Sequence, residues 1–246
     1  MFPEPKPSNP ILNVAKLVKR FGGFYALDGL SFHVAEGEIL GLVGPNGSGK
    51  TTAINVISGL YAPDGGEVTL DGSSIGGVAS HLLVHRGINR TFQVPKPFLS
   101  LTVRENIAVA LAYGRAQVAP PPIGELLDEY RLTEVADRPA SDLNSAQQKL
   151  LDLTRALATR PRLLLLDELA AGFNPTELDW IAARIKALAA TGMAIIVVEH
   201  LMGFIEHITD RVIVLNAGKE IFEGKLAAAV KEPQVIEVFL GGEHVA

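Results

Sequence analysis

A glycine-rich segment at residues 44–52 constrains this chain more than any other feature. An apolar run at residues 39–43 precedes it and has the pattern of a buried strand, whereas residues 52–57 have a helical pattern. A strand that leads through a glycine-rich turn into a helix directs backbone N–H groups and the helix N-terminus at an anion. The segment matches the pattern G-x-x-x-x-G-K-[ST] and therefore predicts a phosphate-binding loop. Its residues are Gly44, Pro45, Asn46, Gly47, Ser48, Gly49, Lys50, Thr51 and Thr52.

The residue types in this loop fit the chemistry of a nucleotide. Lys50 is expected to reach the β- and γ-phosphates, and the hydroxyl of Thr51 is expected to ligate Mg²⁺. The glycines allow the backbone to approach a phosphate closely. The alternative is a glycine-rich turn with an unrelated lysine. The motif alone does not choose among kinases, GTPases and ATPases.

Composition narrows the class of protein. The 246 residues are 48% hydrophobic and 20% charged, which indicates a globular fold with one large core or two small ones. The formal net charge of −5 argues against binding nucleic acid through bulk electrostatics, so no nucleic-acid partner is expected. The absence of cysteine excludes disulfides and thiolate metal sites.

Neither end of the sequence predicts membrane insertion. No apolar run approaches the ~18 residues that suggest a membrane span. The prolines in residues 1–10 predict a short disordered leader rather than a secretion signal. We therefore expect a cytosolic chain whose role at a membrane, if it has one, depends on a partner.

Strand and helix patterns alternate along the chain. This alternation predicts an α/β fold with a mostly parallel sheet and an antiparallel portion formed by the N-terminal strands. A helical pattern at residues 180–190 ends before Gly192, as a helix followed by a C-terminal glycine does. The predicted strands are residues 30–34, 67–70, 162–168 and 194–198, with a hairpin formed by 211–215 and 220–222.

The middle of the chain has a different pattern. Residues 94–158 contain few strand signals and several helical patterns, and three consecutive prolines at 120–122 divide them. We predict that this segment is a helical subdomain inserted in an α/β core. The core would then comprise residues 11–93 and 159–246.

Two adjacent carboxylates end the apolar strand at residues 162–168. At the carboxyl edge of a parallel strand beside a phosphate loop, Asp167 can hold Mg²⁺, usually through water. Glu168 would then position or deprotonate an attacking water, which favours hydrolysis over phosphoryl transfer to another substrate. The alternative is an ordinary strand end with solvated acids.

Three further polar features follow in a fixed order. Gln93 ends an Arg-Thr-Phe-Gln segment, residues 143–147 begin a helix, and His200 follows the strand at 194–198. Singly, Gln93 could be a surface amide, His200 a satisfied polar group, and Asn144 a helix cap with Gln147 as its partner. Their order after a phosphate loop makes a combined function the better interpretation.

This order resembles that of the ATP-binding cassette (ABC) ATPases over nearly the whole chain. The resemblance implies an ATP site in which Gln93 senses Mg²⁺ and couples to a membrane partner, and in which His200 contacts the γ-phosphate together with Lys50. Glu168 would be the catalytic base. An aromatic side chain upstream would stack on adenine, with Phe21 in the expected place and Tyr25 as the alternative.

The same resemblance implies a signature sequence and a dimer. The family's Leu-Ser-Gly-Gly-Gln corresponds to Leu143, Asn144, Ser145, Ala146 and Gln147. In the family, two cassettes dimerise head-to-tail, and each ATP lies between the phosphate loop of one subunit and the signature helix of the other.

Several short sequence segments resemble those of the ATPase subunits of branched-chain amino acid importers. These segments are residues 44–47, 90–93, 170–175, 197–200 and the tail 233–241. Such importers pair two ATPases, the same or different, with two integral membrane permeases and a periplasmic or extracellular solute-binding protein. The resemblance places the chain at the cytoplasmic face of the membrane as a peripheral subunit. Related importers carry urea or short amides, so the solute stays open.

Three positions depart from the family pattern. Asn144 replaces the signature serine, Ala146 replaces its second glycine, and Leu169 replaces the proline that usually follows the Asp-Glu pair. If position 146 needs a positive φ, alanine there would be strained by on the order of 1 kcal/mol. We expect these changes to affect turnover more than nucleotide binding.

The sequence supports two other classes of protein less well. A soluble ABC ATPase of translation or DNA repair usually carries two cassettes or a long coiled-coil insertion, and this chain shows neither. A P-loop kinase or GTPase would leave the signature-like helix unexplained, and no guanine-reading Asn-Lys-x-Asp is present.

Overall fold

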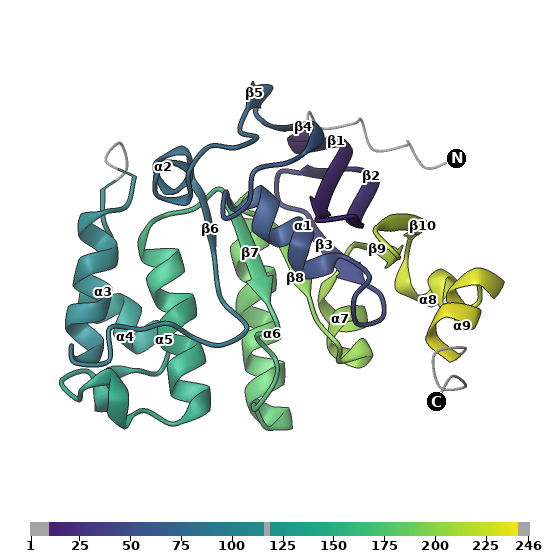
Figure 1. Cartoon of the computed structure of the whole chain (residues 1–246). Coiled ribbons are helices and arrows are strands. Elements are labelled where there is room, and N and C mark those ends of the chain that lie inside the picture. Colours follow the sequence, from purple (N-terminus) through teal and green to yellow (C-terminus); the bar gives the residue numbers. More distant parts are fainter. Residues whose placement is uncertain (1–9, 116–118, 241–246) are drawn as a thin grey trace, which may run out of the picture.

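A six-stranded sheet forms the centre of the molecule, and a second sheet lies against it (Figure 1). The computed structural model describes residues 10–115 and 119–240. The predicted leader lies outside these residues except for Pro10, where the first strand begins.

The larger sheet carries the predicted parallel strands. Five neighbouring strands run parallel, and the edge strand β10 pairs antiparallel with β9 as the predicted hairpin. The central strand β3 leads into the glycine-rich loop, and β8 and β7 lie beside it, so three strand ends meet at one edge. In spatial order the strands are β10 (Lys219–Gly224), β9 (Arg211–Asn216), β3 (Ile39–Val43), β8 (Ala194–Val198), β7 (Leu163–Asp167) and β6 (Ile88–Arg90).

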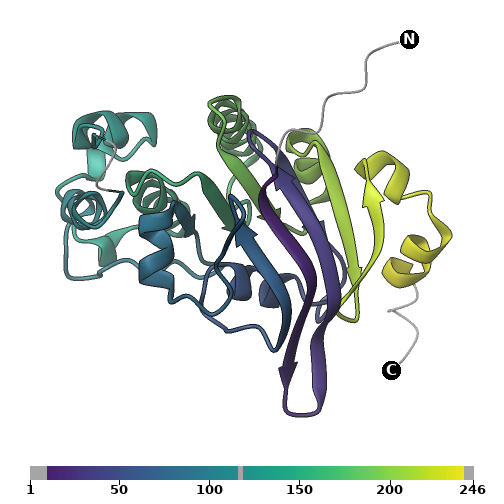
Figure 2. The same ribbon diagram turned by 90° about the horizontal axis from the view of Figure 1, so that it is seen from above.

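The smaller sheet is antiparallel, as predicted for the N-terminal strands. Its order is β2 (Phe24–Ala35), β1 (Pro10–Phe21), β4 (Gly65–Leu70) and β5 (Ser73–Ser74). The long β1–β2 hairpin, in dark purple, lies across the molecule, with the teal helices on one side and the yellow C-terminal elements on the other (Figure 2). Its turn contains Gly22, which has a φ of 59°.

The parallel strands are buried on both faces. Leu164 and Leu166 of β7 belong to a core built with the helices, whereas Leu163 and Leu165 belong to a second core built with α1 (Lys50–Ile57) and the smaller sheet. Side chains alternate across a strand, so one continuous apolar run fills both cores. Burial on both faces explains why these strands read as apolar runs rather than as alternating patterns.

Side-chain caps define the starts of three helices. Thr102 with Glu105, Asn144 with Gln147, and Asn174 with Glu177 form capping boxes, in which each pair satisfies two backbone N–H groups. The helices after α1 are α2 (Ser80–Arg86), α3 (Val103–Ala112), α4 (Ile123–Glu129), α5 (Ser145–Ala158), α6 (Pro175–Ala190), α7 (Met202–Ile208), α8 (Leu226–Ala229) and α9 (Pro233–Leu240).

Between β6 and β7 the described chain is mainly helical. Helices α3, α4 and α5 lie there with two 3-10 helices, Thr133–Val135 and Ala140–Asp142, on the left of Figure 1. This arrangement agrees with an inserted helical segment, and the exact boundaries at 94 and 158 stay a prediction.

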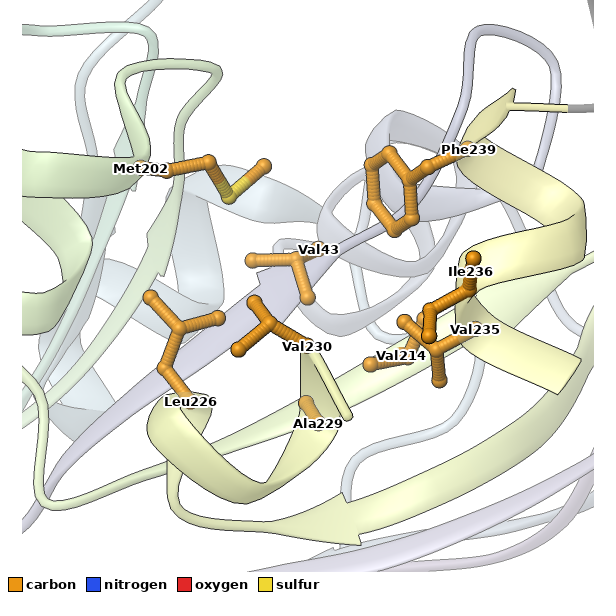
Figure 3. A pocket seen from close by; sticks show the side chains of 9 residues that line it. All are labelled: Val43, Met202, Val214, Leu226, Ala229, Val230, Val235, Ile236 and Phe239. Carbon is orange, nitrogen blue, oxygen red and sulfur yellow. The ribbon is translucent and has the colours of Figure 1, made fainter. Parts of the chain in front are cut away.

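The C-terminal helices line an open apolar pocket of about 310 Å³ beside β9 and α7 (Figure 3). Met202, Val230 and Phe239 point into it from three different helical regions. In the described parts of the chain, no helix combines the length and apolarity that crossing a bilayer requires.

Candidate active site

The glycine-rich loop leaves β3 and ends in α1 with backbone geometry that only glycine fits. Gly44 has a φ of 147°, and a Cβ built on it would lie 2.2 Å from the carbonyl oxygen of Leu215. Gly49, the residue before α1, has a φ of 108°, and its Cβ would lie 2.6 Å from the carbonyl oxygen of Ala26. The glycines of the motif are therefore required because a side chain at either position would clash with a backbone carbonyl.

Lys50 closes the loop on itself. Its Nζ donates hydrogen bonds to the carbonyl oxygens of Gly44 and Pro45, at 2.8 and 2.9 Å. Burial lowers the pKa of Lys50, and the nearby carboxylates of Glu168 and Asp167 oppose that effect. The ammonium thus lies among groups of opposite charge, at the place where the motif predicts the phosphates.

A cavity of about 260 Å³ lies over this loop. Glu168 and His200 line it together with the loop residues, so the structure brings the predicted base, the predicted γ-phosphate contact and the phosphate loop together. The lining consists of Phe21, Phe24, Ala26, Asn46, Gly47, Gly49, Lys50, Thr51, Thr52, Glu168 and His200.

Two aromatic rings stand at the mouth of this cavity. Phe21 lines it and packs edge-on against Tyr61, with ring centroids 5.3 Å apart. Phe24 also lines it and is 62% exposed. Tyr25 is not among the lining residues and lies instead under the guanidinium of Arg20. The geometry favours Phe21 over Tyr25 as the stacking residue and adds Phe24, which the sequence did not suggest.

Glu168 has both carboxylate oxygens engaged by the chain itself. Gln93 donates from Nε2 to Oε2 at 2.8 Å, and Nε2 of His200 lies 3.0 Å from Oε1. The three residues come from the segment after β6, the end of β7 and the end of β8. Gln93 does not line the cavity over the loop, but this contact brings it to the site.

Asp167 is buried beside Glu168 and pairs with Arg90. Nη2 of Arg90 lies 3.1 Å from Oδ2 of Asp167, while a second arm of the same guanidinium bonds Oδ1 of Asn55 in α1. Burial raises the pKa of Asp167, and the charge of Arg90 opposes this. Arg90 therefore keeps one oxygen of a buried carboxylate in place.

The remaining oxygen fits a cation site. Oδ1 of Asp167 is buried, and among the described residues it has no hydrogen-bond partner. Oγ of Ser48 in the loop is likewise buried and has no hydrogen-bond partner among the described residues. Carboxylate and hydroxyl oxygens are ligands that Mg²⁺ prefers. The predicted ligands Thr51, Gln93 and Asp167 are thus compatible with the ion.

The signature residues lie elsewhere on the surface. Oδ1 of Asn144 accepts from the backbone N–H of Gln147 at 2.8 Å, and Oε1 of Gln147 accepts from the N–H of Asn144 at 3.1 Å. Asn144 and Ser145 are exposed, and none of the described residues 143–147 lines the cavity over the phosphate loop. A single copy of the chain thus separates these two predicted parts of the nucleotide site.

The condition for strain at position 146 of the signature is not met. Ala146 lies in the first turn of α5, and it is not among the described residues with a left-handed backbone. The strain expected from a positive φ at this position is therefore not present. Only the added methyl group distinguishes Ala146 from the family's glycine.

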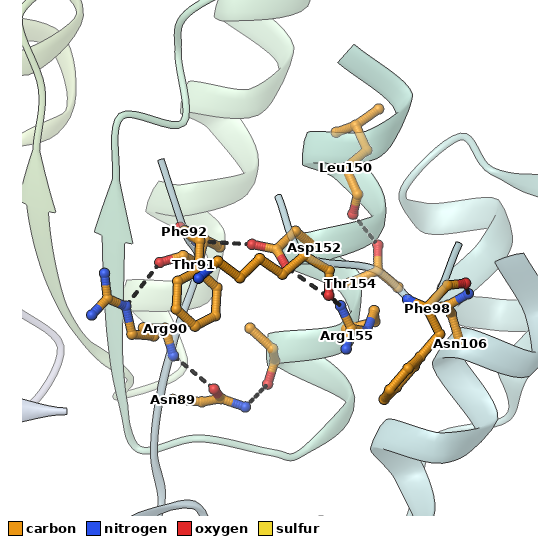
Figure 4. A network of polar contacts seen from close by, with 12 residues as sticks. Asn89, Arg90, Thr91, Phe92, Phe98, Asn106, Leu150, Asp152, Thr154 and Arg155 are labelled. Carbon is orange, nitrogen blue, oxygen red and sulfur yellow. Dashed lines mark hydrogen bonds and ion pairs between the residues drawn. The ribbon is translucent and has the colours of Figure 1, made fainter. Parts of the chain in front are cut away.

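A groove of about 220 Å³ runs beside the segment that carries Gln93. The N–H of Phe92 donates to the buried Asp152 of α5 at 2.9 Å, and Arg155 lies 3.5 Å from the other oxygen of the same carboxylate (Figure 4). Phe98 stacks under the guanidinium of Arg155 at the groove's edge. The contacts tie the segment around Gln93 to the helical region.

Sequence reasoning missed several residues that hold the site. Arg90 stands in the quoted Arg-Thr-Phe-Gln segment, yet its ion pair with Asp167 joins positions far apart in the chain. Lys149 and Glu199 are buried beside the Glu168 turn, and only their position next to recognised motifs could have suggested them.

A phosphate-binding loop after a parallel strand, with a carboxylate and a histidine from neighbouring strand ends, defines a P-loop ATPase. The family model of the ABC transporter matches residues 27–171, which is more than half of the chain. This chain therefore belongs to the ABC transporter family.

Relatives of known name cover almost the whole chain. It is 37% identical to the high-affinity branched-chain amino acid transport ATP-binding protein BraF of Pseudomonas aeruginosa, over 95% of this chain and 99% of that protein. It is 36% identical to the corresponding protein LivG of Salmonella typhimurium, over 95% and 99% of the two chains.

Solved structures agree with the fold. A nucleotide-free ATP-binding cassette from an ABC transporter aligns with a TM-score of 0.83 and 32% identity, over 94% of this chain and 98% of that one. A dimeric bacterial ABC transporter cassette aligns with a TM-score of 0.79 and 26% identity, over 87% and 98%. The predicted family, fold class and ATPase are confirmed, and the transporter subunit is favoured over the soluble alternative.

Proposed function

We propose that this chain is the ATP-hydrolysing subunit of an importer for branched-chain amino acids or a related small polar solute such as urea or an amide. The observation that carries the ATPase is the cavity in which Lys50, Glu168 and His200 meet. The names of BraF and LivG support the class of solute.

The residues divide the chemistry among them. The loop N–H groups, the start of α1 and Lys50 would bind the phosphates of ATP. Glu168 would orient and deprotonate the attacking water, and His200 would donate to the γ-phosphate. Thr51, Asp167 and Gln93 would hold Mg²⁺, which when bound neutralises charge on the phosphates. Catalysis is then mainly positioning and charge stabilisation.

A second ATPase subunit would complete each site. The exposed signature residues Asn144 and Ser145 lie apart from the chain's own phosphate loop, which supports a head-to-tail dimer of like or different subunits. ATP would be part of that interface, so its binding would shift the population toward the closed dimer.

The groove beside Phe92 would receive the permease. Its surroundings expose Val94, Phe98, Leu99 and Tyr113, an apolar set that a single soluble domain rarely leaves open to water. The segment between Gln93 and this surface is short, so movement of a docked permease would reach Glu168. In this arrangement the chain is a peripheral subunit at the cytoplasmic face of the membrane, and a solute-binding protein delivers the cargo on the other side.

Reconstitution tests this function. The chain would be assembled in vesicles with the permeases and binding protein encoded beside it, and ATP hydrolysis measured with leucine, valine, urea or acetamide. The solutes that stimulate ATP hydrolysis identify the class of compound that the importer carries. Failure to assemble with the permeases, together with ATP hydrolysis that neither the permeases nor any solute stimulates, would instead support the soluble ABC ATPase.

A further inference from the structure

The backbone of the predicted base is held in an unusual conformation. Glu168 has a φ of 51°, in the left-handed region that residues with a side chain rarely occupy. Such a conformation persists only where surrounding contacts impose it. Leu169 follows it where the family usually has a proline, so the contacts that fix this turn must come from elsewhere.

Lys149 supplies one set of these contacts. It lies in the second turn of α5, is 6% exposed, and donates from Nζ to the carbonyl oxygens of Glu168 and Leu169, at 2.5 and 3.3 Å. An ammonium that donates to two consecutive carbonyls fixes the direction of both peptide groups. The side chain thus joins the signature helix directly to the turn that carries the base.

Glu199, at the end of β8, binds the same turn that follows Glu168. It is 3% exposed, and Oε1 accepts from the backbone N–H of Ala170 at 2.5 Å. Glu199 immediately precedes His200 in the chain. One buried carboxylate therefore ties the turn after Glu168 to the start of the segment that carries His200.

The two charges stabilise each other in a buried setting. Burial lowers the pKa of Lys149 and raises the pKa of Glu199, and each opposite charge opposes the shift of the other. Both side chains bind peptide groups of residues 168–170, Lys149 from α5 and Glu199 from the end of β8. They therefore act together on one turn.

We propose that Lys149 and Glu199 are positioning residues for hydrolysis: they fix the Glu168 backbone and His200 so that the carboxylate lies between Gln93 and His200. The inference rests on the proposed ATPase role of Glu168. Neither side chain lines the cavity over the phosphate loop within the described structure, so they would act on turnover rather than on nucleotide affinity.

The test compares four variants of the full chain: Lys149→Met, Lys149→Arg, Glu199→Gln and the Lys149→Met/Glu199→Gln double variant. Lys186→Met, on the exposed side of α6, is the matched control. ATP turnover, binding of a non-hydrolysable ATP analogue and thermal unfolding would be measured on each. Lys149→Arg keeps charge and donors, and it stands in for Lys149→Met should the latter not fold.

We expect Lys149→Met to lower kcat about tenfold or more, with analogue affinity within about twofold of the parent. Lys149→Arg should recover part of the loss. The double variant should lose no more than the worse single variant, because the two groups work as a unit.

Several results would overturn this positioning role. They are parental turnover in folded Lys149→Met, a loss of analogue affinity that matches the loss of turnover, or independent effects in the double variant. Failure of the proposed function looks different, since the parent chain itself would then neither bind the analogue nor hydrolyse ATP.

Discussion

Nε2 of His200 lies 3.0 Å from Oε1 of Glu168, so the predicted γ-phosphate contact and the predicted base are in direct hydrogen-bond contact. Gln93 holds the other oxygen of the same carboxylate. Each of these oxygens can accept a second hydrogen bond, so Glu168 can bind the attacking water while Gln93 and His200 fix its direction. We therefore expect the two contacts to orient the base rather than to block it.

The first prediction concerns Lys50. Lys50→Ala should weaken ATP binding and abolish turnover, because it removes the cation expected at the β- and γ-phosphates. Titration with a fluorescent ATP analogue and a phosphate-release assay would measure the two effects. The exposed Lys186→Ala is the control, and unchanged hydrolysis by Lys50→Ala would refute the nucleotide-site assignment.

The second prediction concerns the base. Glu168→Gln should keep ATP binding and stall hydrolysis, since an amide does not accept the proton of the attacking water. The variant should accumulate an ATP-bound dimer, visible by light scattering with ATP and Mg²⁺. The same experiment in the presence of EDTA should show no dimer. Hydrolysis at the parental rate would move the catalytic role to another residue.

The third prediction separates the aromatic residues near the cavity. Phe21→Ala should weaken ATP binding by roughly 0.5–1.5 kcal/mol through lost stacking, and Phe24→Ala should have a smaller effect of the same sign. Tyr25→Ala should leave affinity unchanged, because Tyr25 is not among the lining residues. Isothermal titration with ATP would measure all three. An effect of Tyr25→Ala equal to that of Phe21→Ala would reverse the assignment.

Part of the candidate site could be predicted from the sequence. Lys50 followed from the phosphate-loop motif and Glu168 from its place at a strand end, whereas the role of His200 was implied by the family resemblance. The structure brings all three to one edge of the sheet. The cap formed by Asn144 and Gln147, given as an alternative account of these residues, is present in the structure, and its spacing is local.

The supports of the site could not be predicted in the same way. Arg90, Lys149 and Glu199 act through contacts with residues far away in the chain, and no spacing rule encodes such contacts. Whether Ala146 needs a positive φ was left open by the sequence, and the structure places this residue in a regular helical turn without strain. Local chemistry was thus predictable, whereas the packing that orients it was not.

The fourth prediction concerns stability. Asn106 of α3 is fully buried and lies beside Phe98 (Figure 4). Its amide bonds the backbone N–H and carbonyl of Phe98 and the carbonyls of Leu101 and Thr102. Asn106→Ala should lower the free energy of unfolding by roughly 1–3 kcal/mol, because it leaves buried backbone groups unpaired. Chemical denaturation would measure this loss.

The control for the stability prediction is Asn13→Ala on the exposed side of β1. Its effect should stay within about 0.5 kcal/mol. Equal effects of the two substitutions would contradict a structural role for the Asn106 amide.

The last prediction concerns the variant signature. Asn144 retains the cap of α5 but lacks the family's hydroxyl, and Ala146 adds a methyl group where the partner's phosphate would approach. The isolated chain should therefore be monomeric with weak ATPase activity, as measured by gel filtration and phosphate release. The Asn144→Ser/Ala146→Gly variant should keep the cap and lose at most about 1 kcal/mol of stability, because glycine replaces alanine in the first turn of α5. Its turnover should rise, most clearly in the complex with the second ATPase and the permeases. Lack of any gain in that complex would show that Ser145 and the helix N-terminus already make the site competent.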